Sequence, residues 1–223
     1  MENIERKLCR IFCFSGIIGA VFYLLHDIVG ALNYPGYQWM SQAVSDLTAT
    51  DAPSYTIANG LSGIYGIMSV VCCLFVLVLA QRKNRLTRIG IALFTVMEIV
   101  SAVGYSLFPL SSAGYDGSVQ SFVHVYVVTT AVVLLSIVSL ILIAIGAKKD
   151  REKVLGAAAI IALVLMFAGS VGSGAVPKEY FGVAERFSTY SAVVFTAVLG
   201  LIFGIEKSTV PMQNISGNIA KDI

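Results

Sequence analysis

Residues 33–54, NYPGYQWMSQAVSDLTATDAPS, form the longest polar interruption in a strongly apolar chain. Pro35 and Gly36 predict a turn, since proline fixes φ and glycine tolerates the left-handed conformation that often follows. Tyr37 and Trp39 are of the two types that favour a membrane–water interface. Apolar residues then recur at helical spacing, at Met40, Ala43, Val44 and Leu47. The stretch predicts a structured cap with a short helix on a membrane face, which either closes a helix bundle or faces a ligand.

The chain around this cap is apolar enough to cross a membrane several times. Of its 223 residues, 57% are hydrophobic and 13% are charged, whereas a soluble domain has about 25% charged residues. A helix needs about 20 apolar residues to cross the hydrocarbon of a bilayer. Six runs have about this length, at residues 11–32, 57–80, 89–108, 119–145, 154–176 and 187–205. We therefore predict an all-α, polytopic transmembrane bundle of six helices, with the cap as a structured outer loop after the first helix.

The basic residues predict the orientation of the bundle. They gather before the first run, between the second and third, and between the fourth and fifth, so the positive-inside rule places both termini in the cytoplasm of a multi-pass cell-membrane protein. We expect a cytoplasmic N-terminus at residues 1–10, a transmembrane domain at 11–205 and a polar cytoplasmic tail at 206–223. The first run is too long for a signal-peptide core, and we expect it to be retained. The net charge of +2 is then a signal of topology, and we expect no nucleic-acid partner.

Ionisable residues inside or beside the predicted helices are few, and most of them gather near the outer end. A charge at membrane depth is costly unless it faces the bundle interior and is paired, so such residues are candidates for a functional site. The candidates are His124, Asp46, Glu185 and Arg186 for catalysis, and Tyr37, Ser41 and Asp27 for ligand binding.

Each candidate also has a structural interpretation. Asp27 and Asp46 would equally form ion pairs with Arg186, and Glu185 beside Arg186 would be a simple interface pair. Glu98 stands alone at mid-membrane. It is either a proton relay or, as we favour, a partner in an interhelical hydrogen bond.

Two histidines raise the question of a metal. His26 and His124, with Asp27 or Asp46, would supply enough ligands for an outward-facing zinc site, and the two histidines alone would suit a haem. No HExxH motif or similar spacing fixes these ligands together, and His26 would also reach the surface by extending along the helix. Metal-free acid–base chemistry by His124 with Asp46 or Glu185, on a lipid headgroup, requires less. The chain has no P-loop and no GxGxxG motif, which argues against nucleotide chemistry.

Three short motifs resemble those of a membrane family that is catalogued as domain of unknown function 998. They are YPGY at residues 34–37 followed by Ser41, Ser45, Asp46 and Leu47; Phe108-Pro109 followed by His124; and GVAER at residues 182–186. Family members usually have leucine where this chain has Val183, and Leu110-Ser111 departs from the small polar or acidic segment expected there. The resemblance covers essentially all six helices and implies a six-helix integral membrane fold, with no established activity.

Three functions are open at this point. The first is a membrane-embedded enzyme that acts on a lipid or lipid-linked substrate at the outer leaflet, by acid–base or metal-assisted chemistry. The second is a non-catalytic module that binds a membrane lipid or a partner protein through its outer cap, with Arg186 contacting a phosphate. The third, a transporter of ions or small molecules, ranks behind these because Glu98 is the one charged residue at mid-membrane.

Overall fold

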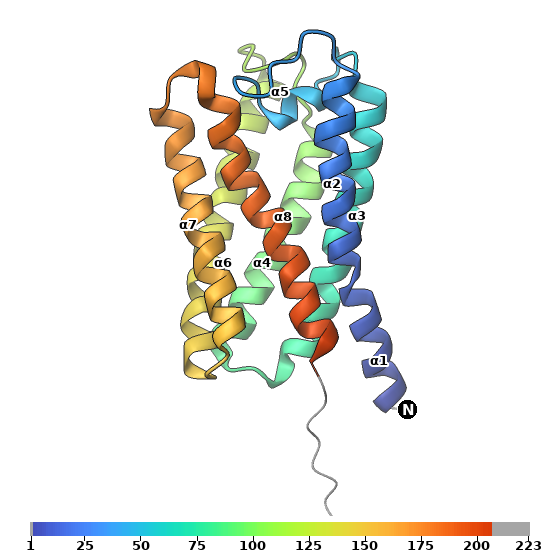
Figure 1. The fold of residues 1–223 in the computed structure, drawn as a ribbon, viewed down its shortest axis with the longest axis vertical. Coiled ribbons are helices and arrows are strands. Elements are labelled where there is room, and N and C mark those ends of the chain that lie inside the picture. Colours follow the sequence, from blue (N-terminus) through green and yellow to red (C-terminus); the bar gives the residue numbers. More distant parts are fainter. Residues whose placement is uncertain (1, 207–223) are drawn as a thin grey trace, which may run out of the picture.

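The computed structural model describes residues 2–206 and shows a bundle of long helices with no strands in that part of the chain (Figure 1). Six of its helical segments are long and apolar enough to span a membrane, which confirms the predicted fold class: Ile4–Leu32, Tyr55–Arg82, Arg85–Leu107, Val119–Lys149, Lys153–Ala175 and Lys178–Ile205. The first helix starts at Glu2, ahead of the predicted boundary. The tail predicted from residue 206 lies outside the described residues except for Glu206 itself.

The spans are built from eight α-helices and several short irregular turns. The α-helices are α1 (Glu2–Cys13), α2 (Ser15–Leu32), α3 (Tyr55–Leu79), α4 (Arg85–Leu107), α5 (Val119–Phe122), α6 (Thr129–Lys149), α7 (Lys153–Ala175) and α8 (Phe181–Ile205). Three 3₁₀ turns, η1 (Val44–Thr48), η2 (Ala80–Arg82) and η4 (Lys178–Tyr180), and one π-helical segment, η3 (Val123–Val128), lie between them.

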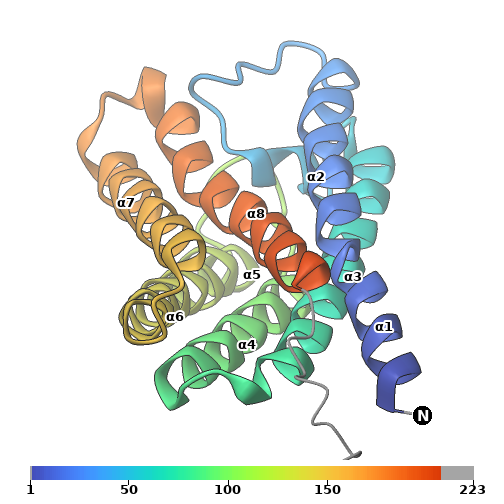
Figure 2. The same cartoon turned by 60° about the horizontal axis from the view of Figure 1, so that its bottom comes forward.

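The long helices pack as a closed ring, in the order α2, α3, α4, α6, α7 and α8, with α8 returning to α2 (Figure 2). Small residues allow the close crossings: Gly146 of α6 lies against Thr87 of α4, and Gly169 of α7 lies against Ser188 of α8. A large apolar core, which includes Phe94 packed edge-on against Phe195, fills the ring. The ring fixes which side chains face inward and which face the membrane.

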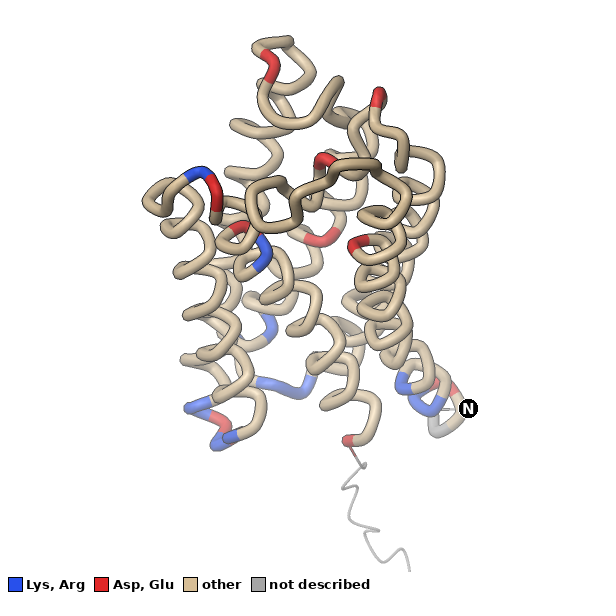
Figure 3. The backbone as a smooth tube through the Cα atoms, turned by 45° about the horizontal axis from the view of Figure 1, so that its top comes forward, with Lys and Arg blue, Asp and Glu red and all other residues tan. Residues whose placement is uncertain are grey.

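The two ends of the bundle differ in their charges (Figure 3). We call the end that carries residues 33–54, 108–118 and 176–180 the loop end, and the end that carries the α3–α4 and α6–α7 connections the basic end. Most Lys and Arg residues lie at the basic end, whereas Asp and Glu residues occur at both ends, with Asp27, Asp46 and Glu185 among those at the loop end.

The cap at residues 33–54 differs in detail from the predicted membrane-face helix. Its only regular part is the 3₁₀ turn η1, and Val44 and Leu47 are buried against α2 and α3. The turn at Gly36 has φ +81°, as the Pro-Gly pair predicts. Met40 lies outside the helical turn and is exposed. The cap therefore closes this end of the bundle, because Val44 and Leu47 are buried against the helices and its backbone is held by carboxylates of the site described next.

Candidate functional site

Arg186, near the start of α8, is the hub of the loop end. Its Nε and Nη2 donate to the two carboxylate oxygens of Asp27 on α2, at 3.0 and 2.7 Å. Nη2 also donates to the hydroxyl of Tyr37 at 2.9 Å. Nη1 donates to backbone carbonyls of the cap and of α8, namely those of Trp39, Gln42 and Gly182. Every N–H of the guanidinium group therefore has an acceptor inside the protein.

Asp27 and Tyr37 complete this hub. Asp27 Oδ2 also accepts from the Tyr190 hydroxyl at 3.0 Å, and the Asp27 and Arg186 side chains are only 13% and 12% exposed. Tyr37 donates to the carbonyl of Ala43 at 2.8 Å, and burial raises the pKa of its phenol above the ordinary value, so the hydroxyl keeps its proton. The ion pair between Asp27 and Arg186 thus joins α2, the cap and α8.

Two further carboxylates hold the start of the 3₁₀ turn. Asp46 accepts from the backbone N–H of Ala43 at 3.1 Å and from that of Gly114 at 2.8 Å. Glu185 accepts from the next backbone N–H, that of Val44, at 3.3 Å. Burial raises the pKa of the Asp46 carboxyl above its ordinary value, although the two backbone hydrogen bonds oppose the shift. Asp46 and Glu185 are therefore brought to neighbouring amides, where they fix the cap in place.

His124 lies apart from this hub, in the π-helical segment η3. Its Nδ1 is 2.7 Å from the carbonyl oxygen of Phe108, and its ring lies 4.7 Å from that of Tyr105. A carbonyl only accepts, so Nδ1 carries the hydrogen and the neutral ring keeps a free lone pair on Nε2. Such orientation of an imidazole suits a general base, and π-helical turns are frequent at functional sites.

His26 and Ser41 take no part in the hub. The ring of His26 is 3% exposed and packs edge-on against Tyr23, and neither ring nitrogen has a hydrogen-bond partner among the described residues. Ser41 donates to the carbonyl of Gln38 within the cap. No group of three or more His, Cys, Asp or Glu within residues 2–206 could hold a metal ion. The hypothesis of a zinc site at His26 and His124 is therefore left without a ligand set, and the haem alternative stays a prediction.

Glu98 lies at the centre of the ring, 2% exposed. It accepts from the hydroxyl of Thr196 at 2.6 Å, which joins α4 to α8. The predicted interhelical hydrogen bond is confirmed.

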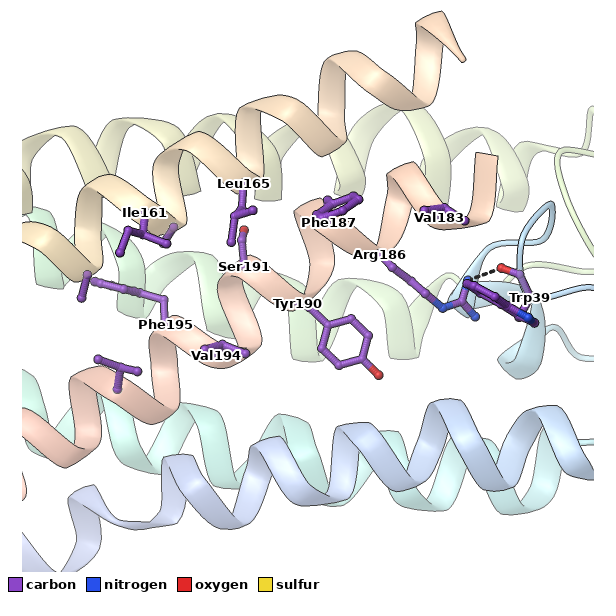
Figure 4. A pocket seen from close by; sticks show the side chains of 13 residues that line it. Trp39, Ile161, Leu165, Val183, Arg186, Phe187, Tyr190, Ser191, Val194 and Phe195 are labelled. Atoms are coloured by element: carbon purple, nitrogen blue, oxygen red, sulfur yellow. Dashed lines mark hydrogen bonds between the residues drawn. The ribbon is translucent and has the colours of Figure 1, made fainter. Parts of the chain in front are cut away.

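A groove of about 480 Å³ lies beside the hub, along α7 and α8 (Figure 4). Trp39 and Arg186 stand at one end of it, and Ala158 and Val198 line the part furthest from the cap. The remaining lining is almost wholly apolar and comes from the two helices: Ile161, Ala162 and Leu165 of α7, and Val183, Phe187, Tyr190, Ser191, Val194 and Phe195 of α8.

This groove was not predicted from the sequence, because its lining is almost wholly apolar and looks like any other membrane-facing surface. The available signal was the pair of small residues Ala158 and Ala162, one helical turn apart on α7. Tyr190, the second donor to Asp27, was also missed.

The fold and the loop-end site define an integral membrane protein of six helices. A family model described as "Protein of unknown function (DUF998)" matches residues 17–202, so the chain belongs to this family, in agreement with the motif resemblance. No curated protein and no solved structure matches the chain.

Proposed function

We propose that the protein binds a membrane lipid, with an acyl chain lying along the groove between α7 and α8. The groove itself carries this proposal. Its walls belong to two membrane-spanning segments, and residues such as Val194, 53% exposed, face outward where the surrounding medium is hydrocarbon. A volume of about 480 Å³ falls in the range of about 300–1,000 Å³ that is typical of ligand sites.

The dimensions of the groove fit a lipid chain. Val183 and Val198 are separated by four turns of α8, which is about 22 Å at 1.5 Å per residue. That length exceeds the roughly 15 Å of hydrocarbon in one leaflet, half of a core about 30 Å thick. An extended acyl chain therefore has room along the helix without leaving the apolar lining.

The polar part of the lipid would lie at the loop end, beside Trp39. This indole is exposed at the end of the groove and can donate one hydrogen bond while its ring stays in the interface. Arg186 borders the same place, but its donors are bound to protein groups and its charge is paired with Asp27. We therefore expect little preference for an anionic headgroup here, and we assign Arg186 to holding the cap.

By the positive-inside rule we place the basic end in the cytoplasm. The groove would then receive its lipid from the outer leaflet of the cell membrane. This orientation would be tested by accessibility labelling of single cysteines in the cap, on intact cells.

The proposal is tested by native mass spectrometry of protein purified in mild detergent. We expect the wild type to retain a lipid, and Val194→Trp, which fills the groove, to lose it by about tenfold or more, since a blocked chain forfeits at least 1.4 kcal/mol of burial. Val164→Trp is the matched control, since Val164 is exposed on α7 outside the groove lining. Equal retention by both variants would contradict the proposal.

Acid–base chemistry is a second candidate, and the geometry of His124 favours it. The other predicted catalytic residues, Asp46, Glu185 and Arg186, are engaged in holding the cap. His124→Asn keeps a donor near the Phe108 carbonyl but removes the base. Loss of a cellular phenotype with an intact fold would support chemistry at this residue, and an unchanged phenotype would count against it.

A further inference from the structure

We propose that a second groove, between α3 and α4 at the basic end, binds the headgroup of an anionic phospholipid through Arg85 and Arg88. It has a volume of about 330 Å³ and is lined by Leu77, Gln81, Arg85, Arg88, Ile89 and Ala92. The four residues from α4 follow the spacing i, i+3, i+4 and i+7, so they form one face of the helix.

The two arginines are free to bind an anion. Both are exposed, and neither has an ion pair or a side-chain hydrogen bond with any residue in the described part of the chain. Two positive charges one turn apart repel each other, so a bound anion would relieve an unfavourable pair. The planar guanidinium fork matches the oxygens of a phosphate group.

Lys83, at the same end of the bundle, is a cation whose charge is already paired inside the protein. Its ammonium bonds to Glu152 and Glu206 and lies over the ring of Phe203, 5.3 Å from the centroid. Burial works against the ammonium, yet the two carboxylates raise its pKa overall, so Lys83 stays charged and its charge is used inside the protein. Arg85, two residues further on, has no such acids.

The rest of the groove selects a lipid over a soluble phosphate compound. Leu77, Ile89 and Ala92 continue from the arginines into the two spanning segments Tyr55–Arg82 and Arg85–Leu107. The charged part of the groove therefore lies where the helices meet the membrane surface, and the apolar part lies deeper. A molecule with an anionic head and an apolar chain fills both parts, and basic pockets between membrane helices are typical binding places for such headgroups.

This site is independent of the groove at α7 and α8. The two grooves lie on different helix pairs, and the α7–α8 groove has no unpaired cation. Binding at α3 and α4 should therefore depend on headgroup charge, whereas binding at α7 and α8 should not. Either proposal can fail without the other.

The test uses native mass spectrometry of the full chain in micelles doped with equal amounts of phosphatidylglycerol and phosphatidylcholine. We expect the wild type to retain phosphatidylglycerol preferentially. The double variant Arg85→Gln/Arg88→Gln should lower that retention by about 10- to 30-fold, since each surface arginine contributes about three- to fivefold to anionic-lipid binding. Lys148→Gln/Lys149→Gln removes the same charge from exposed positions at the same end and should change retention by less than about threefold.

A second variant tests the groove without changing its charge. Ala92→Trp fills the apolar part and should also reduce the retained phosphatidylglycerol, with both arginines still present. Equal losses from the arginine and lysine pairs, or full retention by Ala92→Trp, would overturn the site in favour of diffuse attraction to the basic end. Matching unfolding temperatures in lipid-free detergent would show that the variants compared are folded.

Discussion

The two ends of this bundle use arginine in opposite ways. At the loop end, Arg186 is nearly buried and gives all its hydrogen bonds to Asp27, Tyr37 and backbone carbonyls. At the basic end, Arg85 and Arg88 are exposed, and no described residue pairs with them. A charged side chain near the membrane boundary can therefore stabilise the fold or be available to a ligand. Which of the two applies depends on whether it is already hydrogen-bonded to other groups of the protein.

The predicted catalytic residues and the groove beside them also differ in whether they are bound within the protein. Asp46 and Glu185 accept from adjacent amides of the cap, so their place near the membrane boundary follows from the need to hold a buried backbone. The apolar groove beside them has almost no polar lining apart from Arg186, Tyr190 and Ser191. The apolar groove and the charged hub are therefore neighbours that differ in chemistry.

The largest expected effect comes from removing the buried arginine. Arg186→Gln should lower the free energy of unfolding by about 3–5 kcal/mol, because it leaves the Asp27 carboxylate buried without its cation. Arg85→Gln should change it by less than about 0.5 kcal/mol, as is usual for an exposed side chain. Unfolding of both variants in the same detergent measures the difference. Similar losses of unfolding free energy in the two variants would contradict the distinction between a buried, paired arginine and an exposed, unpaired one.

A second variant identifies the cause of that loss. If the unpaired carboxylate is responsible, Asp27→Asn added to Arg186→Gln should restore part of the stability. A double variant no more stable than Arg186→Gln alone would contradict this cause.

The close approach of the cap to α8 can be tested at Gly182. A Cβ at this position would overlap the backbone carbonyl oxygens of Trp39 and Gln42, so Gly182→Ala should cost about 1–3 kcal/mol, as overpacking does. Gly174→Ala is the control, since open space surrounds that position on α7. A fall in unfolding temperature for Gly174→Ala alone would contradict the tight seating of the cap.

His26 offers a smaller test of how polar groups are satisfied at the loop end. Both ring nitrogens are buried without a partner in the described structure, and such atoms destabilise a fold. His26→Phe keeps an aromatic ring and should leave the free energy of unfolding unchanged or raise it by about 1 kcal/mol. A loss of about 2 kcal/mol or more, measured in the same assay, would mean that water or a ligand normally binds the imidazole.

The smallest expected effect concerns pH. Burial raises the pKa of Asp46 in the folded protein above its ordinary value of 3.8, so the folded state takes up a proton before the unfolded state does. The contribution of Asp46 to stability should then increase as the pH falls through the raised pKa towards 3.8. Asp46→Asn should remove this dependence from unfolding curves recorded across that range. An unchanged slope in the variant would assign the pH dependence to another group.

The spanning helices could be predicted from the sequence, whereas most hydrogen bonds of the loop-end site could not. Six long apolar runs leave few alternatives to six spanning helices, and the gathering of acidic residues near Asp46 and Glu185 was also visible. Half of the acceptor atoms of Arg186 are backbone carbonyl oxygens, and the acceptor of His124 is the carbonyl oxygen of Phe108. A backbone oxygen has no letter in the sequence, so these pairings appear only once the chain is folded.

The grooves were hidden for a related reason. Val194 and Ile161 look like any other lipid-facing residues in their helices, and only the crossing of α7 and α8 makes a hollow between them. The short helix predicted at the cap is a 3₁₀ turn in the structure, and its first amides, those of Ala43 and Val44, donate to Asp46 and Glu185. Both features depend on how different elements pack against one another in the folded chain.

The most direct test of lipid binding is photolabelling in membranes with a phospholipid that carries a diazirine in its acyl chain, followed by peptide mapping. The groove predicts strong labelling of α7 and α8 around Ile161 and Val194, reduced in Val194→Trp and preserved in Val164→Trp. Labelling spread evenly over all lipid-facing helices, including the exposed Val103 of α4 and Val138 of α6, would show ordinary contact with the bilayer and contradict a lipid site.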